Sequence, residues 1–426
     1  MIINALVIVF VLLGIKSIIL DRNGIENSLQ LIILAFILGY RTFEPIPGFK
    51  LHPIELFIYA CIIRIIISNA VKYREISLGI SMLGIFFIAY FFIDLLTGYH
   101  FMVLLEFKNA FLLILIFFIT QHIHFSKSYF VRLLKYYLMA ASLISILGII
   151  EHLFPSFMSS IFGFESEPIN NLKSVFFTRL AFLFWGSHLA ANLIAPVFPI
   201  LILLKVEKDS IIKNNYVLTF LVIVNLFAIY LSGNRISWLI ITILLFATIT
   251  QYRSSLIPYM KPYALFITIA FVAYIYSQPV EGRYISTFKA LTGNIDTRYD
   301  SSSGERIVRA NIAINSIFEK PFGTGWGSQG WVHSDVLQIG ASIGVIPGLI
   351  LFLTPLFLLF RIYKFYLLAS PDNQTDFFVC CGLLIFVIIS LSLNGNIMKV
   401  QSGVPLLVLW AIIDGYYRSY SQIRSN

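Results

Sequence analysis

The sequence predicts an all-α polytopic membrane protein with about 12 to 13 transmembrane helices and a long external loop that contains short amphipathic helices. Of the 426 residues, 58% are hydrophobic and only 12% are charged, and the mean hydropathy is +0.87. A soluble domain usually has about 25% charged residues, so this chain cannot cover a globule with polar surface. The apolar runs are long enough to cross a bilayer as helices, and the alternating pattern of a barrel is missing.

Apart from a longer loop at 154–180, which is expected to face outward, the expected spans follow one another with short connectors as far as residue 279. They cover about 2–20, 28–42, 53–70, 76–97, 109–123, 136–153, 181–204, 215–231, 236–251, 263–279, 335–360, 377–394 and 403–417. The first run lacks a basic segment and a small-residue cleavage site, so we expect a retained helix and not a signal peptide. One integral membrane domain is expected, with helices 1 to 10 in residues 1–279, an external (periplasmic) loop at 280–334 and helices 11 to 13 in 335–426.

Short basic connectors mark one side of the membrane. They contain Lys72/Arg74, Lys127/Arg132/Lys135, Lys205/Lys208/Lys213, Arg253/Lys261, Arg361/Lys364 and Arg418/Arg424. The positive-inside rule makes them cytoplasmic, so the turn at Ser232–Asn234 and the long loop face outward. The formal net charge of +9 suits an anionic lipid surface or an anionic lipid-linked substrate. Nucleic acid is not an expected partner, because the basic residues are scattered over both sides.

Polar residues are concentrated between Ser301 and Gly348. Ser301–Gly304 is expected to form a turn and helix cap, and the segment from Arg306 to Phe318 has helical periodicity. On that periodicity the shared apolar face consists of Ile307, Ala310, Ile314 and Ile317. Pro321 and the glycines after it should end the helix. The pattern predicts a short amphipathic helix at the membrane interface, with Arg306 in its first turn.

Arginines on the outward side are candidate anion ligands. Arg235 follows Ser232-Gly233-Asn234 at a turn between two expected spans, and Arg306 opens the loop helix. A guanidinium is always charged, and its planar fork can engage two phosphate oxygens at once. An interfacial arginine can equally extend to lipid headgroups, and that alternative stays open. The same two interpretations apply to Arg179, Arg283, Arg298 and Arg309.

His333 stands between Trp331 and Ser334, directly before the next expected span. Histidine is the side chain best suited to accept or donate a proton near neutral pH, although a lone histidine is often only a satisfied polar residue. No second His or Cys follows at ligand spacing, and no nucleotide-binding loop is present, so neither a metal nor a cofactor is expected. The three cysteines, Cys61, Cys380 and Cys381, lie in apolar runs and should pack as small hydrophobes.

Three segments together resemble the O-antigen ligase and O-antigen polymerase superfamily. The turn Ser232-Gly233-Asn234-Arg235 is similar to the family's short Ser/Thr-x-Arg turn. Gly304-Glu305-Arg306, the helix after it and Lys320-Pro321-Phe322-Gly323 resemble the family's external-loop helix. His333-Ser334, nine residues and then Gly344 match the pattern of the ligases, but Pro347 stands where the second glycine is expected and Gly348 follows it.

This resemblance implies a metal-independent GT-C glycosyltransferase in a bacterial inner (cytoplasmic) membrane, with its active site facing the periplasm. The donor would be an oligosaccharide on undecaprenyl pyrophosphate. Arg235 and Arg306 would hold the pyrophosphate, and His333 would contact the acceptor hydroxyl or the reacting sugar. The further substrate-binding candidates are Arg309, Arg283, Arg179 and Ser334. The lipid bilayer and a chain-length regulator are the other candidate partners.

Among these activities we expect polymerisation of lipid-linked repeat units, since the external loop is compact and the ligase pattern slips at Pro347. An O-antigen ligase, which would transfer the glycan to lipid A-core, shares the donor chemistry and is the alternative. A flippase for the same lipid-linked sugar is the alternative of another class. A flippase should show pseudo-symmetric halves and a charged central path, whereas this chain concentrates its polar residues in one loop.

Overall fold

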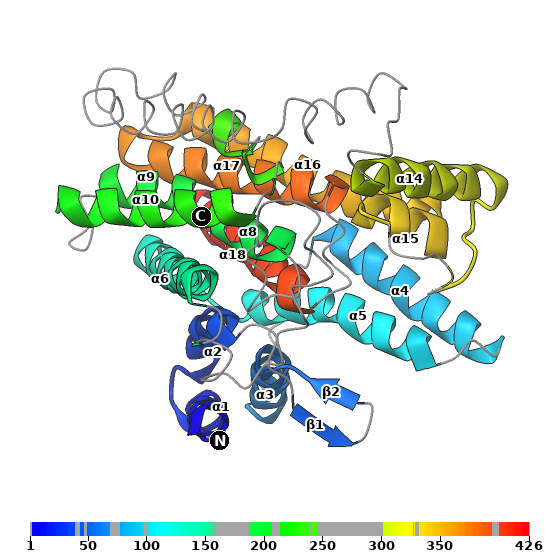
Figure 1. Ribbon diagram of the computed structural model, residues 1–426, viewed down its shortest axis with the longest axis horizontal. Coiled ribbons are helices and arrows are strands. Elements are labelled where there is room, and N and C mark those ends of the chain that lie inside the picture. Colours follow the sequence, from blue (N-terminus) through cyan, green and yellow to red (C-terminus); the bar gives the residue numbers. More distant parts are fainter. Residues whose placement is uncertain are drawn as a thin grey trace.

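The protein is an all-α polytopic membrane protein, as predicted (Figure 1). The structure is a computed structural model. It describes residues 2–38, 43–46, 49–68, 77–97, 101–154, 157, 187–206, 214–232, 234, 236–238, 240–244, 301–326, 328, 332–393 and 400–425. Within these ranges, four helices are long and apolar enough to cross a membrane, and five shorter apolar helices accompany them. The predicted total of 12 to 13 spans stays a prediction, because the predicted span at 263–279 lies outside the described residues.

The first half of the chain forms a series of helices with one short hairpin. Its elements are α1 (Ile2–Leu20), α2 (Gly24–Leu34), the 3-10 helix η1 (Ala35–Leu38), β1 (Phe43–Ile46), β2 (Phe49–Leu51), α3 (Pro53–Ile67), α4 (Leu78–Leu96), α5 (Phe101–Gln121) and α6 (Lys127–Leu153). The antiparallel pair β1–β2 is an element that the sequence did not predict. α5 and α6 begin well before their predicted starts, because polar residues lowered the apolar signal there without ending the helix.

The second half contains broken helices. Its described elements are α8 (Ser187–Ile194), α9 (Val197–Val206), α10 (Asn215–Ser232), α14 (Ser301–Glu319), α15 (Asp335–Ile343), α16 (Val345–Leu368), α17 (Pro371–Leu393) and α18 (Val400–Ser425). The prediction of single helices at 181–204 and 335–360 was wrong. The first run is interrupted before Val197, next to Pro196, and the second is interrupted at Gly344.

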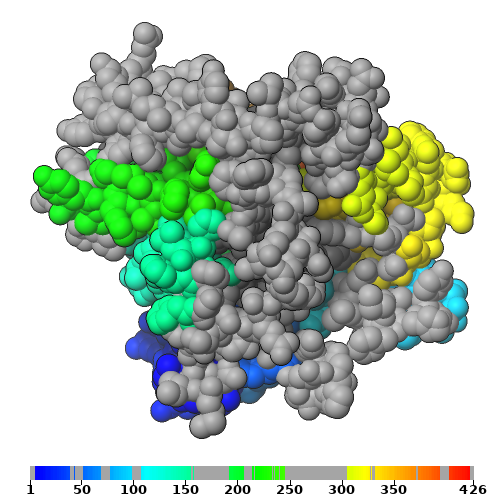
Figure 2. Space-filling model, in the orientation of Figure 1, coloured from blue at the N-terminus to red at the C-terminus, as the bar shows by residue number. Residues whose placement is uncertain are grey.

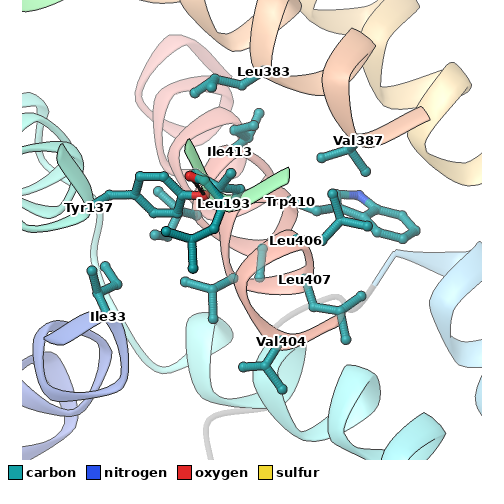
Figure 3. Close-up of a cluster of buried hydrophobic side chains, with 14 of the residues drawn as sticks. Ile33, Tyr137, Leu193, Leu383, Val387, Val404, Leu406, Leu407, Trp410 and Ile413 are labelled. Carbon is teal, nitrogen blue, oxygen red and sulfur yellow. Dashed lines mark hydrogen bonds between the residues drawn. The ribbon is translucent and has the colours of Figure 1, made fainter. Parts of the chain in front are cut away.

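α18 lies at the centre of the hydrophobic core and contacts α2, α5, α6, α8, α16 and α17. Figure 3 shows Trp410 and its neighbours on α18 facing side chains from several other helices. The Trp410 ring meets Phe117 of α5 edge-on, with 5.1 Å between the ring centroids. The Tyr137 hydroxyl of α6 donates to the Leu193 carbonyl at 3.0 Å, which satisfies a buried polar group beside this core.

Large apolar side chains remain exposed on the outer faces of α1, α4 and α16. Leu12 of α1, Leu96 of α4 and Phe357 of α16 are each more than half exposed. In a soluble protein such patches would be costly, but lipid tails solvate them without penalty. The exposed apolar faces therefore fit the bilayer environment that the composition predicts.

Candidate functional site

The helix break at Gly344 is the centre of the candidate site. Gly344 has φ +117°, a backbone conformation that side chains with a Cβ rarely adopt, and it separates α15 from α16. Pro347 is tolerated three residues later because the first-turn N–H groups of a helix have no partner within it. Gly344, which matches the ligase pattern, is therefore the residue at which the predicted span breaks, and Pro347, which departs from that pattern, lies in the first turn after the break.

The loop 321–325 closes the broken backbone. Thr324 N donates to the Ala341 carbonyl at 2.9 Å, and Gly325 N donates to the Ser342 carbonyl at 3.0 Å. In the opposite direction, Val345 N donates to the Pro321 carbonyl at 2.9 Å. Unpaired backbone groups are expensive in a membrane, so this loop allows the helix to break. A Cβ at Gly323, whose φ is +93°, would come within 2.4 Å of the Ser342 carbonyl oxygen.

α14 packs along α15 and lies at the surface of the molecule (Figure 2). Ala313 is fully buried against Val332 and Ala341, and a Cβ on Gly340 would come within 3.1 Å of the Ile317 side chain. The prediction of this helix was correct, but its details were wrong. The helix already begins at Ser301, and Ser301–Gly304 belongs to its first turn and is not a turn before it.

The buried face of α14 is also rotated from the predicted one. Positions 306, 310, 313 and 317 share the face that packs on α15, whereas Ile314 is more than one-third exposed. The reason is tertiary: the small Ala313 lets the two helices approach closely, and hydrophobicity alone could not identify that face. Val308, Ile312 and Phe318 remain exposed, as a helix at a membrane interface requires.

Arg306 lies on the face of α14 that packs on α15. It is two helical turns, or about 10.5 Å, before Ala313 on that face. The residue is half-buried, and its Nε atom is shielded from solvent. A partly desolvated guanidinium interacts more strongly with an anion than one in bulk water. Of the predicted arginines, Arg306 is therefore the one that the described structure holds within the packed site.

Arg309 has a different environment. Its Nη2 atom lies 2.8 Å from the Glu305 carboxylate, and its Nε donates to the same oxygen at 2.9 Å. Both side chains are exposed, by 40% and 57%. An exposed pair of this kind has little effect on stability, but it occupies the guanidinium with a neighbouring carboxylate. Arg309 therefore lies in an exposed ion pair, to one side of the face of α14 that packs on α15.

His333 and Ser334 lie at the beginning of α15. The Ser334 hydroxyl accepts from Leu337 N at 3.2 Å and so forms the N-cap of this helix. His333, directly before the cap, is half-buried, and its Nδ1 atom is shielded from solvent. The predicted substrate contact of Ser334 stays a prediction, since the structure shows it in a capping role.

A buried tryptophan and a buried carboxylate complete the loop. Trp326 is fully buried, and its ring meets Phe87 of α4 at 5.4 Å and Phe107 of α5 at 6.5 Å between centroids. Its backbone N–H donates to the carboxylate of Asp94, near the end of α4. Asp94 stands out in the sequence, because a charge within an apolar span is a functional candidate by default.

Two buried polar atoms near the loop have no hydrogen-bond partner among the described residues. They are the indole N–H of Trp326 and the amide oxygen of Gln338. Gln338 lies in α15, one turn after Asp335. Leaving a buried donor or acceptor unpaired costs about 1–3 kcal/mol, so native proteins usually have a reason for it. One donor and one acceptor suit a ligand rich in hydroxyl groups.

An ion pair between α3 and α5 involves another charge that lies in a predicted span, Glu55. Glu55 of α3 lies 2.8 Å from Lys108 Nζ of α5 and also accepts from the backbone N–H of His52 at 2.6 Å. His52 and Glu55 thereby form the capping box at the start of α3. We interpret this pair as structural, since both of its charged groups are neutralised within the bundle.

The other predicted arginines, Arg235, Arg283, Arg298 and Arg179, lie outside the described residues. The turn before Arg235 is described in part. The Asn234 side chain accepts from Ile236 N at 3.0 Å, and Ser232 accepts from Asn234 N at 3.2 Å. The predicted convergence of Arg235 with Arg306 stays a prediction. Among the described residues, no group of three His, Cys, Asp or Glu side chains could hold a metal ion.

Comparison of the sequence with models of known protein families found no matching family, and comparison with curated proteins found no match.

Proposed function

We propose that the protein polymerises oligosaccharide repeat units carried on undecaprenyl pyrophosphate, at the periplasmic face of a bacterial inner membrane. One observation carries this proposal. The loop helix α14, which bears Arg306 on its packed face, lies directly against α15, and His333 immediately precedes that helix. The family resemblance of the sequence motifs assigns the donor phosphate and the acceptor to these two residues.

The chemistry needs the groups that this arrangement offers. The hydroxyl oxygen of the acceptor sugar attacks the anomeric carbon of the donor, and the bond from that carbon to the pyrophosphate oxygen breaks. The diphosphate leaves with the bonding electrons, and Arg306, assisted by Arg235, stabilises its charge. Preplaced charges of this kind often supply the largest part of catalysis. His333 accepts the hydroxyl proton, a contribution of about 10²–10⁴-fold.

The unpaired polar atoms of Trp326 and Gln338 support a glycan as the substrate. Sugar hydroxyls both donate and accept hydrogen bonds, so they suit an indole N–H as well as an amide oxygen. In this scheme Asp94 is a positioning residue, because its carboxylate holds the backbone of Trp326.

A ligase is the second candidate function. The ligase-like pattern runs from His333 to Gly344, and Gly344 is the residue at which the helix breaks. The pattern therefore coincides with a structural feature of the site. In a ligase, the same donor chemistry would transfer the glycan to lipid A-core in place of a second lipid-linked unit.

A reconstitution distinguishes the candidates. Purified protein in detergent is supplied with the lipid-linked repeat unit alone, and the products are separated by chain length. A ladder of multiple repeats supports the polymerase. A product that forms only after lipid A-core is added indicates the ligase. The third outcome is that no glycosidic bond forms under either condition, while the reconstituted protein moves the lipid-linked unit from one leaflet of a liposome to the other. That outcome would identify a flippase and refute the enzyme proposal.

A further inference from the structure

A second candidate site lies at the far end of α16, between this helix and α18. A pocket of about 610 Å³ is lined by Phe357, Phe360, Arg361 and Lys364 of α16 and by Tyr417 and Ser421 of α18, among others. Arg361 is 16 residues after Val345, so the pocket is about 24 Å along the helix from the break at Gly344. That separation is close to the thickness of a bilayer's hydrocarbon core, about 30 Å.

The pocket is cationic. Arg361 Cζ stands 4.7 Å from the centre of the Phe357 ring, and Lys364 Nζ stands 4.5 Å from the centre of the Phe360 ring. Each aromatic ring supports the cation one turn later, so the two charges are held on the same side of α16.

The neighbouring carboxylate does not neutralise these cations. The Asp414 carboxylate attracts Arg361 electrostatically, but its ion pair is with Arg418, whose Nε lies 2.8 Å from the Asp414 Oδ2 atom. Three cations and one carboxylate leave a local charge of two positive among these side chains. The charge complement of the pocket is therefore an anion.

An exposed apolar stripe on α16 lies beside the pocket. Ile346, Leu349, Leu353, Phe357 and Phe360 are each about half exposed and follow one another at helical spacing along α16. This apolar stripe leads from the break at Gly344 to the pocket. A free phosphate would use only the cations, whereas a lipid would use the cations and the stripe together.

We propose that this pocket binds the headgroup of an anionic phospholipid, with its acyl chains along the exposed stripe of α16. On the predicted topology, Arg361 and Lys364 are cytoplasmic, so the lipid belongs to the leaflet opposite the candidate active site. Basic residues that line a pocket between membrane helices at the cytoplasmic surface are typical of such lipid sites. The site is independent of the glycosyl-transfer proposal.

Native mass spectrometry of the full chain tests this site. The purified protein is titrated in detergent with phosphatidylglycerol or with phosphatidylcholine of the same acyl chains. We expect bound phosphatidylglycerol and about thirtyfold weaker binding in Arg361→Gln/Lys364→Gln. The control is Arg22→Gln/Arg132→Gln, which removes the same charge from two exposed residues. These two control residues lie close to another contact between helices, in which the Tyr129 hydroxyl of α6 donates to the Glu26 carbonyl of α2, and they are not part of the pocket.

Three results would overturn the proposal. The first is equal binding of the two lipids, and the second is an equal loss in the pocket variant and in its charge-matched control. The third is complete displacement of the lipid by inorganic phosphate at millimolar concentration, which would identify a free-phosphate site. Both substituted pocket residues are exposed, so unchanged thermal unfolding of the lipid-free variants will show that the fold is intact.

Discussion

The two ends of the helix bundle satisfy their buried polar groups in different ways. At the end formed by α14 and α15, backbone groups of the loop 321–325 satisfy backbone groups of the broken helix. At the opposite end, side chains satisfy side chains. Asp376 of α17 is bound by Lys127 at 3.2 Å and by the Tyr416 hydroxyl at 2.9 Å, and Arg418 binds Asp414. The first end is thus closed by backbone pairing between a loop and a broken helix, whereas the second end is held by ion pairs and hydrogen bonds between side chains.

The largest effect on stability is expected at the ion-paired end. Asp376→Ala would leave Lys127 and the buried Tyr416 hydroxyl without their carboxylate, and we expect a loss of about 3–5 kcal/mol in unfolding free energy. Denaturant unfolding in detergent measures it. Asp376→Asn is the matched control, since its amide oxygen still accepts from Tyr416, and its loss should be smaller. If Asp376→Ala were as stable as the wild type, the ion pairs would not stabilise this end of the bundle.

At the loop end the largest effect should be on activity. Arg306→Ala is expected to lower glycan transfer by about 10²–10³-fold, because the leaving diphosphate loses a preplaced cation. Arg309→Ala is the matched control on the same helix, and we expect a change of less than about threefold because Arg309 is bound to Glu305 in an exposed pair. Equal losses in the two variants would remove the basis for assigning Arg306 to the site. Both proteins should insert and unfold normally.

A change in the loop backbone should affect stability and activity together. Gly323→Ala forces a Cβ against the Ser342 carbonyl at a residue with φ +93°, and we expect a loss of about 1–3 kcal/mol. Phe322→Ala, at the exposed neighbouring residue, should stay within about 0.5 kcal/mol of wild type. Thermal unfolding and the transfer assay measure both variants. If Gly323→Ala lowered stability no more than Phe322→Ala does, the close packing of the loop against Ser342 would not be needed to stabilise the helix break.

The smallest expected effect separates two roles of Ser334. Ser334→Ala removes the N-cap of α15 and should cost about 1 kcal/mol of stability, while Ser334→Asn can still cap the helix. If capping is the whole role, Ser334→Asn retains both stability and transfer. Normal stability with a large loss of transfer in Ser334→Asn would instead show that the hydroxyl binds substrate.

Some of the site could be predicted from local patterns. The loop helix, Arg306 within it and His333 before the next span follow from periodicity, glycines and residue chemistry. The break at Gly344 was also encoded, in Gly344 and Pro347, but the apolar run around them concealed it. The contact between Trp326 and Asp94 was not predicted, because it joins a loop to a helix that meets it only in the fold.

The sequence by itself determined that the chain is helical and lies in a membrane, since 58% hydrophobic residues leave too little polar surface for any other environment. It also determined where α14 ends, because the proline and glycines after it act through the local backbone. Only the tertiary structure decided which face of α14 is buried and which carboxylate holds Trp326. Those choices depend on the shape of neighbouring helices and on backbone pairing between distant segments, and neither has a local signal in the chain.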